Sequence, residues 1–294
     1  MERVGWLVVL VPFVAAQASG QVSRYPNSQL LLETQELAAK LSDPDLRILD
    51  ARPANEYRES HLPGAVSFPA LSTDNLEANR QGYPLPVDWA QRLFRAAGIQ
   101  AGSRIVIYDD QANRFAARVF YVLEFFGHSY LQVLNGGFSK WRAEGRPTTS
   151  ESTQVPPGDF TPTPHPARIA TSEWVNAHLK DSSVILVDAR SPEEFRGEKV
   201  FGQRGGRIPG AVNIEWTRAV SPGQIKTFLE PGPLAKLFQD SQVTPNREIV
   251  SYCQMGVRAA EIYFALRLMG YERVRVYDGS WEDWSVNPAL PVEK

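Results

Sequence analysis

The one cysteine of the chain, Cys253, stands in a stretch whose residue types suit nucleophilic chemistry at sulfur. The stretch reads SYCQMGVRAAE, in which Arg258 follows the cysteine after four intervening residues. A thiolate is a strong nucleophile, and a neighbouring cation or a helix N-terminus lowers the pKa of a thiol. Gly256 permits close backbone approach or a positive φ angle, and Arg258 supplies a permanent positive charge. The pattern predicts a thiolate held in a polar loop; the alternative is a buried apolar cysteine, the common state of free thiols.

The neighbouring sequence predicts that Cys253 follows a strand and precedes a helix. The run EIVSY, residues 248–252, has the composition of a buried strand, and AAEIYFALRLMG, residues 259–270, has helical periodicity. In parallel α/β sheets, binding sites form at the carboxyl ends of strands, where the following helix begins. The loop from Cys253 to Arg258 therefore lies where backbone N–H groups can turn toward an anion.

An internal repeat favours the reactive interpretation of Cys253. RIVIYDDQANRFAARVF aligns with EIVSYCQMGVRAAEIYF, which sets Asp109 opposite Cys253 and Arg114 opposite Arg258. An aspartate does not suit a buried apolar position, but it is natural at a strand end that faces solvent. We therefore expect Cys253 to occupy a polar site as well.

The repeat extends over most of the chain and predicts two domains of one fold. Asp-Ala-Arg (50–52 and 188–190) precedes Pro-Gly-Ala-Val (63–66 and 209–212) in both halves, and the second half carries eight extra residues around KVFGQRGG. Strand-like runs without polar alternation indicate parallel sheets buried on both faces. We expect an α/β fold with two similar domains, each a mostly parallel sheet flanked by helices.

The predicted domains are joined by a linker and preceded by a targeting segment. The N-terminal domain is expected over residues 25–145 and the C-terminal domain over 169–294, and residues 146–168, rich in Pro, Thr and Ser, are expected to contribute little to a core. Residues 1–20 have the basic start, short apolar run and small residues of a secretory signal peptide. An uncleaved N-terminal anchor is the alternative. We expect a periplasmic or secreted protein. Because the chain has one cysteine, no intramolecular disulfide is expected.

The charge balance excludes a large class of partners. The chain has 31 basic and 33 acidic residues, well interspersed, and a formal net charge of −2. No basic surface for nucleic acid or for an anionic membrane is expected. We predict small-molecule partners, no stable membrane insertion after cleavage of the signal, and a monomer.

Taken together, the motifs resemble the tandem-domain rhodanese family of sulfurtransferases. The resemblance covers about residues 30–288 and rests on Asp-Ala-Arg, Pro-Gly-Ala-Val and Tyr-Cys-Gln-Met-Gly-Val-Arg in this order. It implies that only the C-terminal domain is catalytic, and Asp109 at the cysteine position of the first domain agrees. It also implies that Cys253 takes the outer sulfur of a donor such as thiosulfate as a persulfide and passes it to cyanide or another thiophilic acceptor. No metal and no organic cofactor is implied.

The resemblance and the loop together give the candidate site. Inward-facing amides of the loop would stabilise the anionic persulfide. Related cysteine phosphatases have five residues between cysteine and arginine, and the four present here suit a smaller group bound to sulfur. The resemblance implies that Arg190 binds the donor, and the alternative is an ion pair with Asp188, Glu193 or Glu194. The predicted site residues are Cys253 as nucleophile and, for substrate binding, Arg190, Gln254, Met255, Gly256, Val257 and Arg258.

The identity of the donor is open on the sequence. Family members that prefer thiosulfate often carry basic residues after the cysteine, whereas those that prefer 3-mercaptopyruvate carry Gly-Ser-Gly; this loop has neither, but it retains Arg258. We predict thiosulfate, with 3-mercaptopyruvate as the alternative and a persulfide carrier or sulfide sensor as a third hypothesis. His61, in ESHLPGA, is interpreted as part of a structural turn, although a histidine there has been linked to the active site in the mercaptopyruvate branch.

Overall fold

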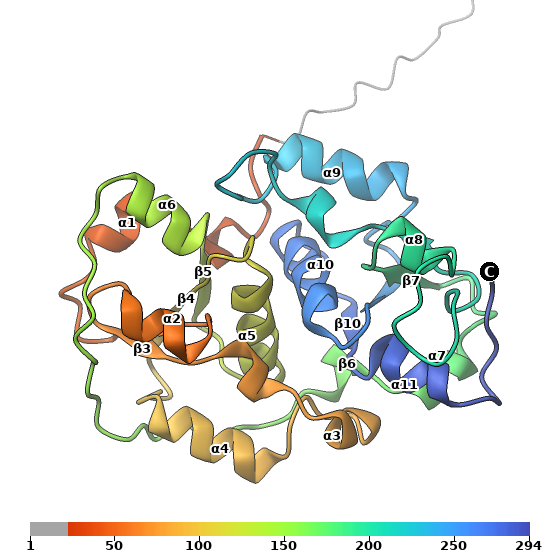
Figure 1. Cartoon of the computed structure of the whole chain (residues 1–294), viewed down its shortest axis with the longest axis horizontal. Helices are drawn as coiled ribbons and strands as arrows, with labels where there is room; N and C mark the ends of the chain where they lie inside the picture. Colours follow the sequence, from red (N-terminus) through yellow and green to blue (C-terminus); the bar gives the residue numbers. More distant parts are fainter. Residues whose placement is uncertain (1–22) are drawn as a thin grey trace, which may run out of the picture.

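The computed structural model describes residues 23–294, so the predicted signal peptide lies outside the described residues. Two domains of the same architecture lie side by side, the first in red to light green on the left and the second in green to blue on the right (Figure 1). No helix within residues 23–294 is long and apolar enough to cross a membrane.

Each domain contains a five-stranded sheet, and every strand pair in both sheets is parallel. In spatial order the first sheet consists of β1 (Leu31–Leu32), β5 (Leu131–Leu134), β4 (Arg104–Tyr108), β2 (Leu46–Asp50) and β3 (Ala65–Ser67). The second consists of β6 (Ile169–Ala170), β10 (Val274–Tyr277), β9 (Glu248–Tyr252), β7 (Val184–Asp188) and β8 (Val212–Asn213). The predicted α/β fold with two similar parallel sheets is confirmed.

Helices cover both sheets. The α-helices of the first half are α1 (Thr34–Ala38), α2 (Ala54–Glu59), α3 (Leu76–Arg80), α4 (Val87–Ala96), α5 (Arg114–Phe125) and α6 (Gly137–Ala143). Those of the second half are α7 (Ser172–Ala177), α8 (Pro192–Phe195), α9 (Pro231–Asp240), α10 (Val257–Leu268) and α11 (Ser280–Val286). Four short 3₁₀ helices lie among the described residues, at Ser28–Leu30, Ala70–Thr73, Pro166–Arg168 and Trp216–Ala219.

The two domains meet along α5 and α10, which lie next to each other at the centre of Figure 1. Both helices are buried on nearly all sides, because one face covers the helix's own sheet and the other packs on the partner helix. The rings of Phe120 and Phe264 meet edge to face at a centroid distance of 4.8 Å. A single apolar cluster continues from one domain into the other, so the two halves form one packed body.

The linker follows the outer edge of the N-terminal domain and is packed against it (Figure 1). Thr149 forms a bridge with His61, and the ring of Phe160 lies 6.0 Å from that of Phe94. The expectation that this segment contributes little to a core was therefore wrong for Phe160, which is buried in the large cluster. Phe160 and a series of backbone hydrogen bonds together hold the segment against the N-terminal domain.

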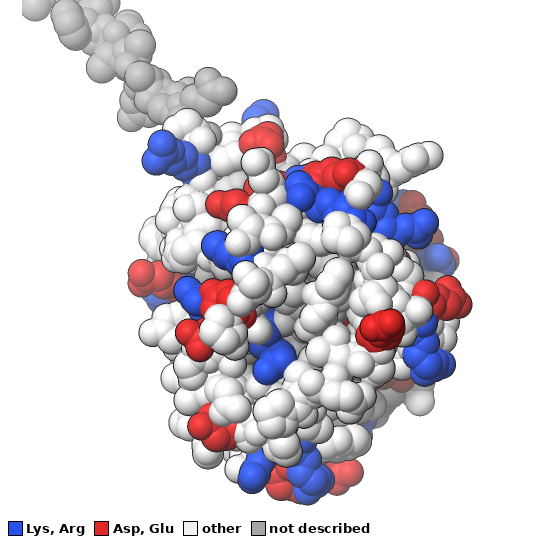
Figure 2. Space-filling model, turned by 90° about the vertical axis from the view of Figure 1, so that its left-hand side faces the viewer, with Lys and Arg blue, Asp and Glu red and all other residues white. Residues whose placement is uncertain are grey.

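Basic and acidic side chains are interspersed on the outer face of the N-terminal domain, with no large area of one sign (Figure 2). This distribution agrees with the balanced composition of the chain.

Candidate active site

Cys253 is the first residue after β9, the central strand of the second sheet, and its side chain is 1 % exposed. Gln254, Met255 and Gly256 connect it to α10, and Gly256 adopts the left-handed conformation with φ 81°. No side chain of the described residues caps the N-terminus of α10. The first N–H groups of this helix therefore remain available to an anion bound at the cysteine.

Ser280 fastens both ends of this loop. Its Oγ accepts hydrogen bonds from the backbone N–H of Cys253 and of Gly256, each at 3.1 Å, and donates one to the carbonyl of Tyr277 at 2.8 Å. The backbone N–H of Trp281 donates to the carbonyl of Cys253 at 3.0 Å. The turn between β10 and α11 therefore determines where the cysteine backbone lies.

The side chain of Asp278 packs against Gly256 of the loop, and it forms an ion pair with a residue of the N-terminal domain. A Cβ added to Gly256 would lie 2.1 Å from Oδ1 of Asp278, so no other residue fits there without displacement. The carboxylate of Asp278 pairs with the guanidinium of Arg118 on α5, and both side chains are fully buried. Arg118 also donates to the carbonyl of Thr73 at 2.7 Å. The N-terminal domain thus contributes to the support of the loop that follows Cys253.

Arg258, the second residue of α10, reaches toward α8 and pairs with Glu194. Its Nη1 and Nη2 donate to the two carboxylate oxygens of Glu194 at 2.7 and 2.9 Å. Burial alone would raise the pKa of Glu194, but the hydrogen bonds and charge of Arg258 hold that pKa below its usual value. Arg258 is therefore fixed beside Cys253, with much of its charge balanced by one carboxylate.

Arg190 lies outside the lining of the pocket around Cys253. Its side chain is 2 % exposed, and its guanidinium donates to both oxygens of Asp188 and to the carbonyl of Gly206 at 2.8 Å. Arg52 of the first domain binds Asp50 and the carbonyl of Ser60 in the same way. Because the arrangement recurs in the domain without a cysteine, it braces the strand end. The ion-pair alternative describes Arg190, and the expected donor contact does not fit this position.

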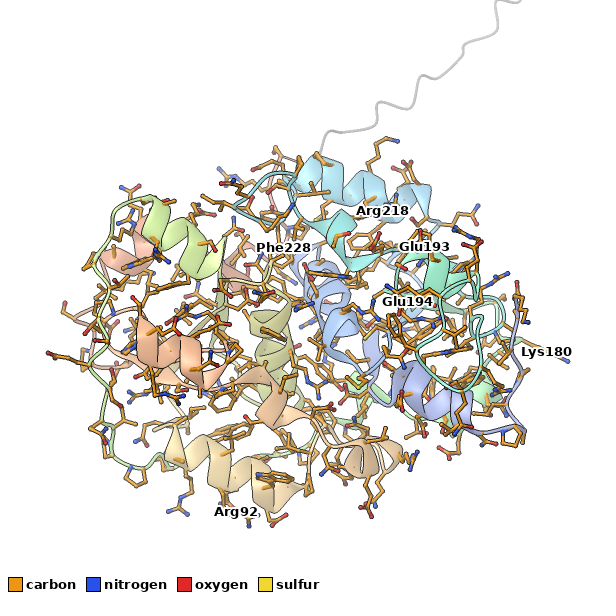
Figure 3. The ribbon with its side chains drawn as sticks, viewed as in Figure 1. Arg92, Lys180, Glu193, Glu194, Arg218 and Phe228 are labelled. Carbon is orange, nitrogen blue, oxygen red and sulfur yellow. The ribbon has the colours of Figure 1, made fainter. Side chains whose placement is uncertain are left out.

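A pocket with a volume of about 680 Å³ opens over Cys253 between the two domains. Of the predicted site residues, five line it: Cys253, Gln254, Met255, Val257 and Arg258. Gly256 packs against Asp278 instead and is not part of the lining. The other lining residues are Arg114, Phe115, Ser191, Glu194, Lys199, Phe201, Glu215, Trp216 and Glu282. Glu194 and Glu193 both come from α8 (Figure 3), and of the two only Glu194 is buried and lines the pocket.

A family model described as a rhodanese-like domain matches the chain twice, at residues 33–144 and 171–287. The chain belongs to the rhodanese family.

Curated relatives cover nearly the whole of this rhodanese. A thiosulfate sulfurtransferase of Azotobacter vinelandii is 35 % identical over 264 residues, which are 90 % of this chain and 97 % of the relative. A probable 3-mercaptopyruvate sulfurtransferase of Pseudomonas aeruginosa is 36 % identical and covers 90 % of this chain and 98 % of its own length. The sulfur carrier protein TtuD of Thermus thermophilus is 32 % identical over 92 % of this chain and 98 % of its own.

Solved structures show the same fold. The anaerobic ergothioneine biosynthesis enzyme from Chlorobium limicola, in complex with trimethyl histidine, superposes with a TM-score of 0.80. It is 24 % identical, and the match covers 92 % of this chain and 71 % of that one. At this identity the similarity concerns the fold alone.

In the N-terminal rhodanese domain, the loop that corresponds to the one at Cys253 is filled by the side chain of Asp109. The carboxylate of Asp109 accepts four backbone hydrogen bonds, from the N–H groups of Gln111 (3.1 Å), Asn113 (2.9 Å), Phe115 (2.7 Å) and Ala116 (3.1 Å). The expectation of a solvent-facing Asp109 was wrong, because the side chain is 1 % exposed and the amides replace water. Burial raises the pKa of Asp109 to about 6, against the opposing effect of these four donors.

The two loops differ in length by one residue. Asp109 and Cys253 both follow directly on their strands, but α5 begins after Asn113 and α10 begins after Gly256, and both helices have 12 residues. Arg114 therefore corresponds to Val257, and the predicted alignment of Arg114 with Arg258 was wrong by one position. The additional residue lies in the loop. The Ala-Ala pairs at 116–117 and 259–260 and the glycines at 127 and 270 already match with this shift in the sequence.

His61 lies in the N-terminal rhodanese domain and does not line the pocket. Its ring stacks on Tyr57 at 3.7 Å, and its nitrogens lie 2.6 Å from the carbonyl of Tyr57 and 3.1 Å from that of Glu151. This environment agrees with the structural interpretation.

The sequence did not reveal several residues of the site. Lys199 and Phe201 lie in the segment that only the second half carries, and this extra length was a usable signal. Ser280 replaces a glycine of the first copy, so the DGS motif was a second signal. Arg114 enters the pocket only through the packing of α5 on α10, which no local pattern predicts.

Proposed function

We propose that this rhodanese is a sulfurtransferase that moves sulfane sulfur from thiosulfate to cyanide or another thiophilic acceptor. The observation that carries the proposal is the position of Cys253 at the uncapped N-terminus of α10, at the base of the pocket between the domains. Relatives named thiosulfate sulfurtransferase, which align over about nine tenths of the chain, support the assignment.

The residues account for a two-step reaction. The Cys253 thiolate attacks the outer sulfur of thiosulfate, the sulfur–sulfur bond breaks, and sulfite leaves with the electron pair. The terminal sulfur of the resulting persulfide is anionic, and the first N–H groups of α10 stabilise it. Cyanide then attacks that sulfur, thiocyanate leaves, and the thiolate is restored. Neither step consumes an oxidant or a reductant.

A second donor, 3-mercaptopyruvate, is supported by the relative named for it and by the volume of the pocket, about 680 Å³, which exceeds the needs of thiosulfate. The sulfur carrier among the relatives supports the third hypothesis, in which Cys253 carries sulfur to a protein acceptor. We rank thiosulfate first because the pocket contains three cations, Arg114, Lys199 and Arg258.

The decisive experiment measures thiocyanate formed from cyanide with thiosulfate and with 3-mercaptopyruvate in parallel assays. Because Cys253 is the only thiol in the chain, Cys253→Ser should abolish turnover with both donors. Equal activity of the variant would refute the proposal. A persulfide that forms on the wild type without turnover would favour the carrier hypothesis.

We also propose that the mature protein is periplasmic or secreted and monomeric. The support for export is the sequence of residues 1–20 alone, and the monomer is carried over from the sequence analysis as a prediction. The N-terminus of protein recovered from a periplasmic extract should begin near Ser19 or Gln21, and an intact Met1 would contradict cleavage. Light scattering of the purified protein should give the mass of one chain.

A further inference from the structure

The cations of the pocket differ in how much of their charge is already balanced. Arg258 is bound by both carboxylate oxygens of Glu194. Lys199 is exposed, and its Nζ lies 4.7 Å from the ring of Phe201 at the rim. Arg114, from the N-terminal domain, is half-buried in the pocket wall. Only the last of these combines a partly desolvated position with a charge that is not paired.

The guanidinium of Arg114 is held in place without being neutralised. Its Cζ lies 5.3 Å from the ring of Trp216 and 4.8 Å from that of Phe115, so aromatic side chains of both domains orient it. Its Nε is buried without a hydrogen-bond partner among the described residues, and its contact with Gln111 Oε1 is long at 3.4 Å. Buried donors without a partner are rare in folded proteins, so this guanidinium retains hydrogen-bonding capacity that a water or an anion could satisfy.

The carboxyl groups near Arg114 do not cancel its charge. Glu261 on α10 is fully buried, and burial together with Asp109 raises its pKa well above the usual value, which favours the uncharged acid. Glu215 lines the pocket without forming an ion pair to Arg114 within the described chain, and Glu282 accepts a hydrogen bond from Gln254. Of the three carboxylates that line the pocket, Glu194 is paired with Arg258, and Glu215 and Glu282 form no ion pair within the described chain. An anion that enters needs a cation to offset these two.

We propose that Arg114 of the non-catalytic domain binds the anionic end of the sulfur donor, a sulfonate or a carboxylate. This inference rests on the proposed sulfur transfer and adds a substrate-binding residue to it. Arg114 offers a planar set of N–H donors that matches either anion. Arg114 and Cys253 line the same pocket, so a donor bound at Arg114 lies in the same pocket as the nucleophile.

Steady-state kinetics of Arg114→Gln test the inference. Loss of a charge-assisted contact should raise the KM for the donor by about tenfold or more. Transfer of sulfur from preloaded persulfide to cyanide should change less than about twofold, because the donor has already left. Arg114→Lys should recover part of the affinity. Arg92→Gln on α4, remote from the pocket at the lower edge of Figure 3, is the matched control and should behave as wild type.

Assays with two donors distinguish a bound sulfonate from a bound carboxylate. Thiosulfate and 3-mercaptopyruvate are compared with the same variants, so a rise in KM for one donor alone identifies whether sulfonate or carboxylate is bound. A KM within twofold of wild type for both donors would overturn the inference and leave sulfur transfer intact.

A second measurement does not depend on turnover. Sulfate should slow the alkylation of Cys253 by iodoacetamide, which is uncharged, and Arg114→Gln should require about tenfold more sulfate for the same protection. If wild type lacks activity with both donors but this shift is observed, the proposed function fails while Arg114 remains an anion-binding residue. Equal protection of both proteins would refute the role of Arg114.

Discussion

The guanidinium of Arg258 and the carboxylate of Glu194 form a two-bond ion pair that joins the first turn of α10 to α8. Glu194 Oε2 also accepts a hydrogen bond from the backbone N–H of Ser191 at 3.1 Å, so the pair extends into the capping box of that helix. The side chain of Glu194 is 3 % exposed and that of Arg258 is 20 % exposed, so water screens the pair only in part.

Removal of one partner of this pair should cost both stability and activity. Glu194→Ala leaves the guanidinium of Arg258 without its acceptor, and we expect a loss of about 2 kcal/mol in the free energy of unfolding. The ratio kcat/KM should fall, because Arg258 is no longer fixed beside Cys253. Chemical denaturation of Glu194→Ala, Arg258→Ala and the double variant should give a coupling energy of about 1 kcal/mol or more. Glu193→Ala, on the exposed side of the same helix, is the control. If the effects of Glu194→Ala and Arg258→Ala on stability add up in the double variant, the prediction is contradicted.

Ser280→Ala should loosen the catalytic loop. The substitution removes the acceptor for two buried N–H groups, those of Cys253 and Gly256, and we expect a loss of about 2 kcal/mol. Thermal unfolding and the rate of alkylation of Cys253 measure the two consequences. Ser285 is a matched control, because its buried hydroxyl has no hydrogen-bond partner among the described residues. If Ser285→Ala destabilises the protein as much as Ser280→Ala does, the loop contacts are not the cause.

Arg118→Met should destabilise the protein through the charge that it leaves behind. The carboxylate of Asp278 would be buried without its partner, at a cost of about 3–5 kcal/mol. The double variant with Asp278→Asn removes that charge and should recover a large part of the loss. Because Asp278 contacts Gly256, the single variant should also lower kcat. Equal stability of the single and double variants would show that packing, and not charge, is responsible.

Glu261→Gln should change how stability depends on pH. Burial, with a contribution from Asp109 and against that of Arg114, raises the pKa of Glu261 in the folded protein above the unfolded value of about 4.3. Its contribution to stability is therefore fully present below that unfolded value and is lost as pH rises through the folded pKa. The melting temperature of Glu261→Gln minus that of wild type should increase from about pH 5 to pH 8. Glu59→Gln, an exposed substitution on α2, is the control; a difference that stays constant with pH would contradict the raised pKa.

The fold and the position of Cys253 could be predicted because they depend on local patterns. The strand EIVSY is followed directly by the cysteine, and the helix after it begins within the next four residues. The internal repeat predicted the domain organisation, since two copies of one pattern indicate two domains. These predictions do not depend on which distant segments of the chain contact each other.

The pairing of charges could not be predicted, because several acidic residues near each arginine have the right spacing. Arg190 had three candidate partners in the sequence, and the structure selects Asp188. Arg118 and Asp278 are 160 positions apart, and they meet only because α5 packs on α10. Asp109 was placed in solvent because the sequence does not show how many amides converge on its carboxylate.

The carboxylate of Asp109 has a consequence for stoichiometry. The Asp109 carboxylate is part of the same loop as the amides that it occupies. Its effective concentration at these amides is therefore fixed and does not fall when the protein is diluted. A dissolved anion would have to displace a tethered one. The amides of one of the two corresponding loops are thus occupied by the protein's own side chain, and a calorimetric titration with sulfate should saturate at one equivalent per chain.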